Sequence, residues 1–329
     1  MSSLAPTLQA FFTQRLAHQR QASAHTLAAY RDCFRLLLEF LHRQTGKAPA
    51  RLGIEDLTAE VIGAFLEHLE IERGNGVRTR NARLAALHSF FRFASFRHPE
   101  HAQIIQRVLA IPSKRCNRSI VTFLTEPETK ALIAAPDRAQ WIGRRDHALL
   151  LVAVQTGLRI SELTHLACQD VALGPAAYVR CRGKGRKERC TPLMASVRNV
   201  LRVWLRERRG QPSDPVFPTS RGRMLSADAV EFLVRKYAAG AQTKCPSLAG
   251  RAVTPHVLRH TCAMRLLEVG VDTSVIALWL GHEMVETTQI YLQANLAIKE
   301  RALQRTAPLH APPGRYRPSD PVLAFLERL

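Results

Sequence analysis

A histidine and an arginine lie three residues apart in the segment TPHVLRHTCAMR, residues 254–265. Its threonine and proline predict the start of a helix, because threonine caps a first helical turn and proline fits the next position. His256 and Arg259 would then project from one side of the positively polarised helix end, where an anion is favoured. The spacing therefore predicts a phosphate-binding pair. We expect His260 on a different face of this helix, in a packing or supporting role.

A second arginine lies in the segment TGLRISEL, residues 156–163. The glycine is expected to end one helix, with Arg159 in the first turn of the next. The planar guanidinium can bind two phosphate oxygens at once, while Glu162 three residues later steadies the side chain. Taken alone, a surface salt bridge at helical spacing is the commoner explanation of this pair.

A histidine and a tyrosine follow in residues 271–295, VDTSVIALWLGHEMVETTQIYLQAN. The glycine is predicted to end a helix that Asp272 or Thr273 would cap. The residues that this helix is expected to bury are Val275, Ile276, Trp279 and Leu280. His282 would occupy the turn, and a further helix would carry Tyr291. A histidine after a helix-ending glycine is usually a loop residue, so a function for it depends on what else converges there.

A basic ribbon is predicted in residues 177–192, AYVRCRGKGRKERCTP, as two short strands joined by a glycine-bearing turn. Val179 and Cys181 would occupy one face. The other face would carry the alternate basic residues Arg180, Arg182, Lys184 and Arg186. Such a ribbon suits a phosphate backbone, although a charged edge strand that prevents aggregation is the alternative. The Gly-Lys-Gly turn lacks the serine or threonine and the earlier glycine of a nucleotide-binding P-loop.

Length and charge narrow the class of protein. The chain has 329 residues, with 47 Lys and Arg against 27 Asp and Glu, and a formal charge of +20 at pH 7. Two domains and a polyanionic partner, with nucleic acid first, are therefore expected. The longest apolar run, residues 148–154, is far shorter than the roughly 18 residues of a membrane span, and the first residues do not match a secretion signal. We expect a cytoplasmic protein, associated with the nucleoid when bound to DNA.

Cysteine and acidic residues give no sign of a metal site. The seven cysteines are odd in number and form no Cys-x-x-Cys pair, which argues against zinc and against a disulfide framework. We expect reduced, mostly buried thiols. Cys262 is a poor candidate nucleophile, because positions two apart on a helix do not face each other. The acidic pairs at 70/72 and 126/128 are expected at helix ends, where carboxylates are common. Neither a metal ion nor another cofactor is expected.

Residues 1–110 have apolar residues at three- and four-residue spacing and predict a small all-α domain. Its clearest helix spans residues 79–96, with a buried stripe formed by Leu84, Leu87, Phe91 and Ala94. Arg80, Arg83 and His88 would lie elsewhere on the surface of this helix. Arg80 and Arg83 are candidate contacts to DNA phosphates, and a solvated basic face is an equally good explanation.

The rest of the chain divides into a linker, a second domain and a tail. Residues 111–118, IPSKRCNR, predict a linker in which Lys114 and Arg115 lie against DNA. The second domain would cover residues 119–307 and begin with a threonine-capped helix. The tail, residues 308–329, ends in VLAFLERL, whose apolar residues repeat at helical spacing on a segment too short to be stable alone.

Together these residues resemble the tyrosine recombinase, or phage integrase, family, in particular its Xer-like and transposon-type integrases. The family pattern of Arg, Lys, His-x-x-Arg, His or Trp, and Tyr is matched in order by Arg159, Lys184, His256, Arg259, His282 and Tyr291. The resemblance covers residues 119–307 strongly. Residues 4–110 are similar to the family's core-binding domain, with less specific motifs. The implied fold is a mainly α catalytic domain with a small β-sheet (α+β) plus the all-α N-terminal domain, arranged as a two-domain C-shaped clamp on DNA.

The chemistry of DNA cleavage by a tyrosine accounts for these residue types. A free tyrosine has a pKa near 10, so forming its phenolate at neutral pH costs about 4 kcal/mol, and the phosphate repels an incoming anion. Arg159 and Arg259 can hold the non-bridging oxygens and stabilise the transition state, as metal ions do in many nucleases. His256 and His282 can hydrogen-bond the phosphate or handle the nucleophile's proton, and Lys184 can protonate the departing 5′ oxygen.

The resemblance implies a site-specific DNA recombinase or integrase that forms a 3′-phosphotyrosyl bond on Tyr291 without ATP or metal. Its implied partners are double-stranded DNA, other protomers in a tetramer on synapsed sites, and companion recombinases, with the tail docking on a neighbouring protomer. A non-catalytic DNA-binding protein of the same fold and a type IB topoisomerase-like enzyme stay open as alternatives. The target DNA sequence, and the choice among transposition, phage integration, cassette exchange and dimer resolution, also stay open.

Overall fold

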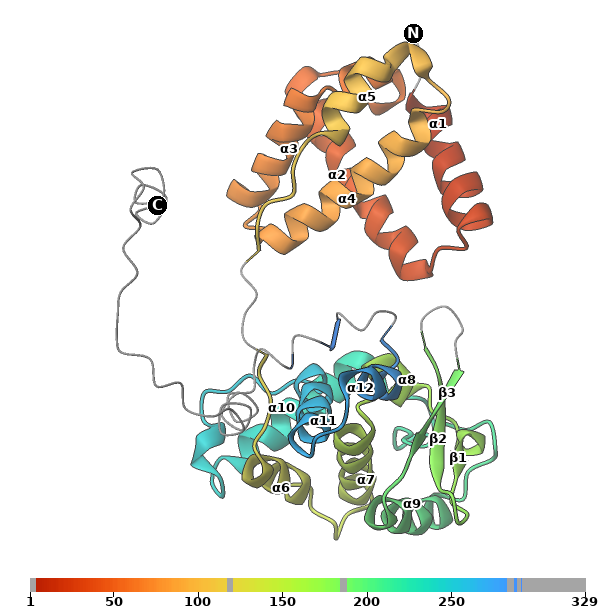
Figure 1. Ribbon diagram of the computed structural model, residues 1–329, viewed down its shortest axis with the longest axis vertical. Coiled ribbons are helices and arrows are strands. Elements are labelled where there is room, and N and C mark those ends of the chain that lie inside the picture. Colours follow the sequence, from red (N-terminus) through yellow and green to blue (C-terminus); the bar gives the residue numbers. More distant parts are fainter. Residues whose placement is uncertain (1–3, 117–120, 184–187, 283–286, 289–290, 292–329) are drawn as a thin grey trace, which may run out of the picture. The chain divides into compact units, whose positions relative to one another are not determined.

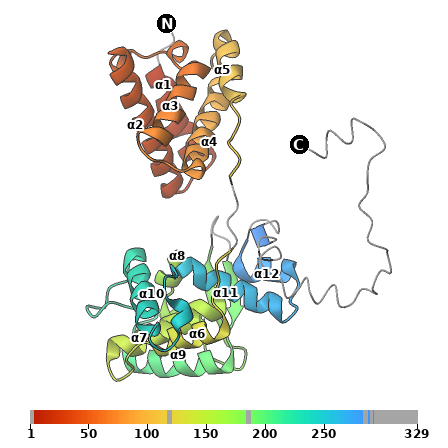
Figure 2. The same cartoon turned by 90° about the vertical axis from the view of Figure 1, so that its left-hand side faces the viewer.

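The computed structural model describes residues 4–116, 121–183, 188–282, 287–288 and 291. The chain forms two compact units, here called the first unit (residues 1–118) and the second unit (residues 119–329). Figures 1 and 2 show them from two directions. The tail predicted from residue 308 lies outside the described residues. No helix in the described part of the chain is long and apolar enough to span a membrane.

The first unit is built of helices, as the sequence predicts. Its elements are α1 (Leu4–Ala10), the π-helix η1 (Phe11–Gln19), α2 (Ala24–Thr45), α3 (Ala59–Ile71), α4 (Val77–Ala94) and α5 (Ala102–Leu109), with short 3-10 turns η2 (Pro49–Arg51), η3 (Ile54–Asp56) and η4 (Pro99–His101). Side-chain oxygens of Ser23 and Thr58 cap the starts of α2 and α3. Aromatic rings fill the core, where Phe90 lies 5.5 Å from Phe11 and 5.1 Å from Phe34.

The helix α4 confirms one part of the sequence interpretation and corrects another. It buries the predicted stripe of Leu84, Leu87, Phe91 and Ala94. The prediction that Arg80 lies at the surface is wrong, because this residue is 6% exposed and donates hydrogen bonds to the Pro112 carbonyl and to Asn81. The segment after α5 runs along α4 here, since Asn81 bonds to both main-chain groups of Lys114. Arg80 therefore holds the linker and is not presented to a phosphate.

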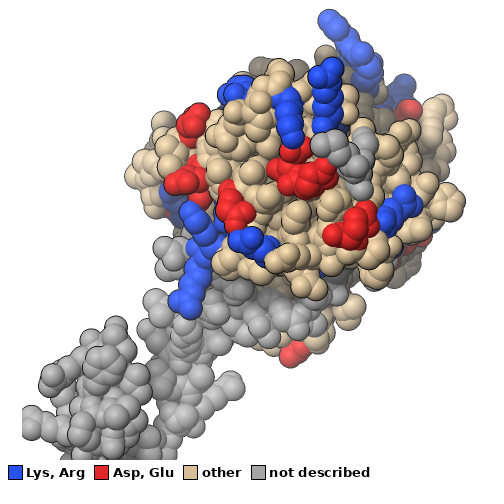
Figure 3. All heavy atoms as spheres, turned by 90° about the horizontal axis from the view of Figure 1, so that it is seen from above, with Lys and Arg blue, Asp and Glu red and all other residues tan. Residues whose placement is uncertain are grey.

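Charges of both signs cover the face of the first unit seen in Figure 3. Acidic side chains gather near its middle, with basic ones around them. Opposite charges pair in this unit, as in Lys47 with Asp56 at 2.5 Å and Lys114 with Glu70 at 2.6 Å. This face therefore differs from the one-signed basic patch that is typical of a nucleic-acid interface.

The second unit combines helices with a small sheet, as predicted. Its helices are α6 (Glu126–Ala134), α7 (Trp141–Thr156), α8 (Ile160–Thr164), η5 (Cys168–Asp170), α9 (Ala195–Arg208), α10 (Ala227–Ala241), η7 (Pro246–Leu248), α11 (Pro255–Glu268) and α12 (Thr273–Leu280). Helix α7 packs against both α9 and α11 in the middle of the unit (Figure 1). The core around it includes Leu150, Leu201, Val234 and Leu258.

The predicted basic ribbon is part of an antiparallel sheet with the order β1-β2-β3. Its strands are β1 (Val171–Ala172), β2 (Tyr178–Arg182) and β3 (Glu188–Pro192). Val179 and Cys181 are buried while Arg180 is exposed, which confirms the predicted alternation over the described residues. Strand β1 was not predicted, because two residues carry no readable period.

Local signals placed the helix ends correctly. Thr125 and Glu128 form the predicted capping box of α6, Thr254 caps α11 and Asp272 caps α12. The prediction that Val275 is buried is wrong, because it is 46% exposed. A short surface helix buries only one stripe, which in α12 consists of Ile276, Ala277 and Leu280.

The seven cysteines are all free, as expected. The expectation that most of them are buried is wrong. Only Cys33, Cys181 and Cys262 are buried, and Cys116 and Cys190 are exposed. Cys116 lies in the linker segment, and Cys190 lies on the exposed face of the edge strand β3.

Candidate active site

The two predicted phosphate-binding arginines meet at the end of α12. Arg159, the residue before α8, donates from Nη2 to the Gly281 carbonyl at 2.7 Å. Arg259, on α11, donates from Nη1 to the Gly157 carbonyl at 2.6 Å and from Nη2 to the Leu280 carbonyl at 2.7 Å. Gly157 ends α7 with φ +62°, and a Cβ there would lie 2.6 Å from the Leu280 side chain. The helix ends are therefore packed closely enough to fix both guanidinium groups.

Arg259 stays charged and keeps free donor capacity at neutral pH. Burial and the nearby charge of Arg159 lower the pKa of Arg259 to about 10, which still leaves it a cation at pH 7. Each guanidinium carries five N–H groups, and the carbonyl bonds of Arg259 use two of them. The remaining N–H groups can be offered to phosphate oxygens.

Three rings connect α11 to the predicted nucleophile. The rings of His256 and His260 lie 4.2 Å apart, and those of His260 and Tyr291 lie 5.4 Å apart. Nδ1 of His260 and the Tyr291 hydroxyl are hydrogen-bonded at 2.9 Å. The prediction that His260 lies on a different face from His256 is wrong, because positions i and i+4 of a helix are neighbours on its surface. His260 contacts the predicted nucleophile directly.

The tyrosine and this histidine are both neutral in the structure. Tyr291 is 1% exposed, and burial raises the pKa of its hydroxyl to about 12. Burial, followed by the charges of His256 and Arg259, lowers the pKa of His260 to about 4. At neutral pH, the phenol therefore keeps its proton, and the imidazole can accept a hydrogen bond from it.

His282 follows α12 directly, in the turn that the sequence predicted. Its ring stacks on that of Tyr291 at 6.4 Å with 14° between the planes, and its Nδ1 lies 2.8 Å from the Thr288 hydroxyl. Burial and the charges of Arg259 and Arg159 lower its pKa to about 4. His282 therefore lies beside the predicted nucleophile as a neutral imidazole.

The residues predicted to contact DNA have different surroundings. Lys184 and Arg186 lie outside the described residues, as does the side chain of Arg182. Arg180 is exposed and bonds to Asp170 at 3.1 Å, and Arg83 donates to the Ala29 carbonyl at 2.8 Å. Lys114 and Arg115 are exposed.

Sequence reasoning missed Arg189 on β3. Its side chain lies between the end of α12 and Glu162, with both Nη atoms 2.8 Å from the carboxylate oxygens. Arg189 stands opposite Cys181 in the sheet register and so belongs to the buried face. The two-residue alternation of β2, continued along the sequence to position 189, could have found it.

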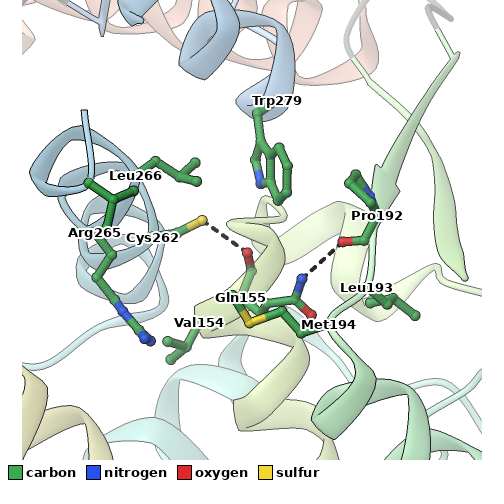
Figure 4. A pocket seen from close by; sticks show the side chains of 10 residues that line it. Val154, Gln155, Pro192, Leu193, Met194, Cys262, Arg265, Leu266 and Trp279 are labelled. Carbon is green, nitrogen blue, oxygen red and sulfur yellow. Dashed lines mark hydrogen bonds between the residues drawn. The ribbon is translucent and has the colours of Figure 1, made fainter. Parts of the chain in front are cut away.

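An apolar pocket of about 340 Å³ adjoins this site. Trp279 on α12, Cys262 on α11 and Pro192 at the end of β3 face one another around it (Figure 4). Burial raises the pKa of the Cys262 thiol to about 12, so it is not a thiolate nucleophile. The pocket leaves apolar side chains exposed near the site, with Met194 at 61% and Val269 at 78%.

Family models match both units of the chain. The phage integrase family matches residues 122–297, and the N-terminal SAM-like domain of phage integrases matches residues 10–98. A putative integrase/recombinase, y4rC, of Sinorhizobium fredii is 56% identical over 328 residues, which cover 100% of this chain and 99% of the relative. The tyrosine recombinase XerC of Rhodospirillum centenum is 35% identical and covers 85% of this chain and 80% of the relative.

Solved structures share the fold. The XerH recombinase bound to its difH substrate matches with a TM-score of 0.68 and 21% identity, over 87% of this chain and 81% of that one. The integrase of the transposon Tn1549, in complex with circular intermediate DNA, matches with a TM-score of 0.69 and 15% identity, over 93% of this chain and 100% of that one. With these matches and the geometry of its site, the chain belongs to the phage integrase family and is a tyrosine-type recombinase.

Proposed function

We propose that this chain cuts and rejoins duplex DNA at specific sites through a 3′-phosphotyrosyl bond on Tyr291, without ATP or a metal ion. The observation that carries this proposal is the meeting of Arg159, Arg259, the histidines and Tyr291 from segments far apart in the sequence. Two guanidinium groups that converge near a tyrosine serve no purpose if the tyrosine is only a surface residue. A site in which a tyrosine attacks a phosphate needs these positive charges to stabilise the transition state.

In this mechanism the two arginines hold the non-bridging oxygens of the scissile phosphate. The Tyr291 oxygen attacks the phosphorus while the 5′ oxygen leaves. We assign to Lys184 the role of donating a proton to this 5′ oxygen. His256 and His260, neutral at pH 7, can receive the phenol proton directly or through water. One P–O bond forms as another breaks, so the bond energy is kept and a 5′ hydroxyl can reverse the step. No outside energy source is required.

A suicide substrate tests the reaction. A duplex nicked close to the cleavage point should trap a covalent adduct on the wild-type chain, because the short cleaved fragment diffuses away. Tyr291→Phe should form no adduct while binding the same DNA, since only the attacking oxygen is lost. Adduct formation would be measured by denaturing gel electrophoresis.

The control for this test is Tyr30→Phe, because Tyr30 packs its ring against Phe11 in the first unit and its substitution keeps that packing. An adduct on Tyr291→Phe would refute the assignment of the nucleophile. No adduct with wild type on its own site would favour the non-catalytic DNA-binding alternative. Relaxation of a plasmid that lacks the site would instead favour the topoisomerase alternative.

Contacts to DNA are proposed for the half-buried Arg83 and the exposed Lys114, Arg115 and Arg180, together with Arg182 and Arg186 of the ribbon. We propose that an N-terminal domain (1–110) and a catalytic domain (119–307), joined by the linker at 111–118, clamp the duplex. The charge of +20 supports this. Arg80 is left out of the DNA-binding set because it is buried.

We further propose that four protomers assemble on two synapsed sites, with the tail docking on a neighbouring protomer. Deleting residues 309–329 should leave binding to a single site unchanged and reduce the fraction of synapsed complexes, because the apolar face of VLAFLERL would be lost. Mobility shift on one site and sedimentation on two sites measure the two effects. An unchanged assembly and recombination rate would refute the docking role.

A further inference from the structure

Arg189 makes a bidentate ion pair with Glu162 inside the second unit. It is the second residue of β3, and its side chain is 12% exposed. Its Nη1 and Nη2 donate to the two oxygens of Glu162 at 2.8 Å each, and its Nε donates to the Trp279 carbonyl at 3.1 Å. All three kinds of guanidinium nitrogen are thus used within the protein. Because each of its guanidinium nitrogens already has an acceptor within the protein, we do not expect Arg189 to bind DNA.

Glu162 is shared between Arg189 and Arg159. Its carboxylate is 3% exposed and also accepts from the main-chain N–H of Arg159 at 2.8 Å and from its Nη1 at 3.1 Å. The hydrogen bonds and charges of both arginines hold the pKa of Glu162 below its usual value despite burial. A buried carboxylate needs cationic partners. With Arg189 in place, Glu162 takes only Nη1 of Arg159, while Nη2 binds the Gly281 carbonyl, and the other N–H groups of that guanidinium stay available.

The end of α12 is held by three arginines. The successive carbonyls of Trp279, Leu280 and Gly281 accept from Arg189, Arg259 and Arg159. Cations are favoured here because the carboxyl end of a helix is negatively polarised. A Cβ on Gly281 would lie 2.8 Å from Nη1 of Arg189, so the backbone of this turn packs closely against the Arg189 side chain. The position of the next residue, His282, therefore depends on the conformation of that turn.

From these contacts we propose that Arg189 is a positioning residue for the cleavage reaction. It neutralises Glu162 so that Arg159 stays free to hold the phosphate, and it supports the turn that carries His282. Without Arg189, the buried carboxylate would draw both arms of Arg159 toward itself. This inference rests on the proposed DNA cleavage by Tyr291.

The test measures single-turnover cleavage of the nicked suicide substrate at saturating protein, together with DNA affinity over a range of salt concentrations. Arg189→Met should cleave about 100-fold more slowly, the order of effect expected when a reacting group is misplaced by about 1 Å. Arg189→Lys should cleave about tenfold more slowly, because lysine keeps the charge but not the fork. The dissociation constant and its salt dependence should stay unchanged. A direct phosphate contact would instead weaken binding and lower the salt slope by about 1.

A double mutant separates positioning from general loss of structure. If Arg189 acts partly through Arg159, adding Arg189→Met to Arg159→Ala should slow cleavage by well under the 100-fold expected in the wild-type chain, because only the support of the turn before His282 is then left to lose. Multiplied effects would overturn the proposal, and so would a cleavage rate of Arg189→Met within threefold of wild type. If Arg189→Met does not fold, the same comparison is made with Arg189→Lys, and a rate equal to wild type would overturn the proposal.

The matched control is Arg144→Met. Arg144 on α7 also binds a glutamate with two guanidinium nitrogens, which lie 2.8–3.0 Å from the carboxylate of Glu207 on α9. This variant should cleave at the wild-type rate. An absence of adduct with the wild-type chain would refute the proposed function itself, whereas normal cleavage by Arg189→Met would refute only the role of Arg189.

Discussion

Arg259→Lys is expected to slow DNA cleavage by about 100- to 1,000-fold, the usual cost of removing one preorganised donor to a developing oxyanion. Arg259 donates two of its N–H groups to the Gly157 and Leu280 carbonyls, and its other N–H groups can bind the phosphate. Lysine has three donors on one nitrogen and cannot bridge two carbonyls and a phosphate at once. Its buried carbonyl partners would also compete for that nitrogen. Single-turnover cleavage of the suicide substrate measures the loss.

DNA affinity should change little in this variant, because the positive charge is kept and many other phosphates are contacted. The control is Arg202→Lys, since Arg202 on α9 also donates to a main-chain carbonyl, that of Leu173 at 3.0 Å. This control should cleave at the wild-type rate. Cleavage by Arg259→Lys within a few-fold of wild type would contradict the assignment of Arg259 to the transition state.

Asp146→Ala is expected to lower the free energy of unfolding of the second unit by about 3–5 kcal/mol, the cost of breaking a buried ion pair from one side. Asp146 accepts from Nε of Arg145 and from the Tyr237 hydroxyl, both at 2.8 Å. Both residues of the ion pair are buried. Without the carboxylate, Arg145 would be a buried charge with no counter-ion at this position. Burial and the Asp146 carboxylate raise the pKa of Tyr237, so its hydroxyl stays a donor and would lose its acceptor.

Denaturant unfolding followed by tryptophan fluorescence measures this effect. All 3 tryptophans, Trp141, Trp204 and Trp279, belong to the second unit, so the signal reports on that unit alone. Glu126→Ala is the control, because it removes an exposed pair with Lys130 that is worth a few tenths of a kcal/mol. A loss below about 1 kcal/mol in Asp146→Ala would show that the network is not a buried ion pair in solution.

Local sequence signals predicted much of the fold because they act within one helical turn or one strand pair. The capping box at Thr125, the threonine before α11 and the left-handed glycines after α7 and α12 depend on neighbours only a few residues away. The alternation in β2 predicted its buried face for the same reason. The proposed catalytic residues were chosen by their types and by their order, which the family resemblance supplied, and they remain a prediction. Lys184 and the tail remain predictions, since they lie outside the described residues.

Contacts between distant segments could not be predicted. Arg80 was expected at the surface, yet a chain segment more than 30 residues later covers it through the Pro112 carbonyl. Periodicity describes one helix and cannot show which loop will lie on it. Arg189 was missed because its partners, Glu162 and the Trp279 carbonyl, come from elements that meet only after folding. Val275 was expected to be buried because the pattern cannot show that α12 has only one covered side.

The sequence alone determined which residue types are available for phosphate chemistry and on which elements they stand, including Arg159, His256, Arg259, His282 and Tyr291. Only the tertiary structure decided how they meet. It packed the ends of α7 and α12 against each other so that main-chain carbonyls orient both arginines. It also brought His260 to Tyr291. These outcomes depend on hydrogen bonds between residues up to 122 positions apart, and such bonds leave no periodic trace in the sequence.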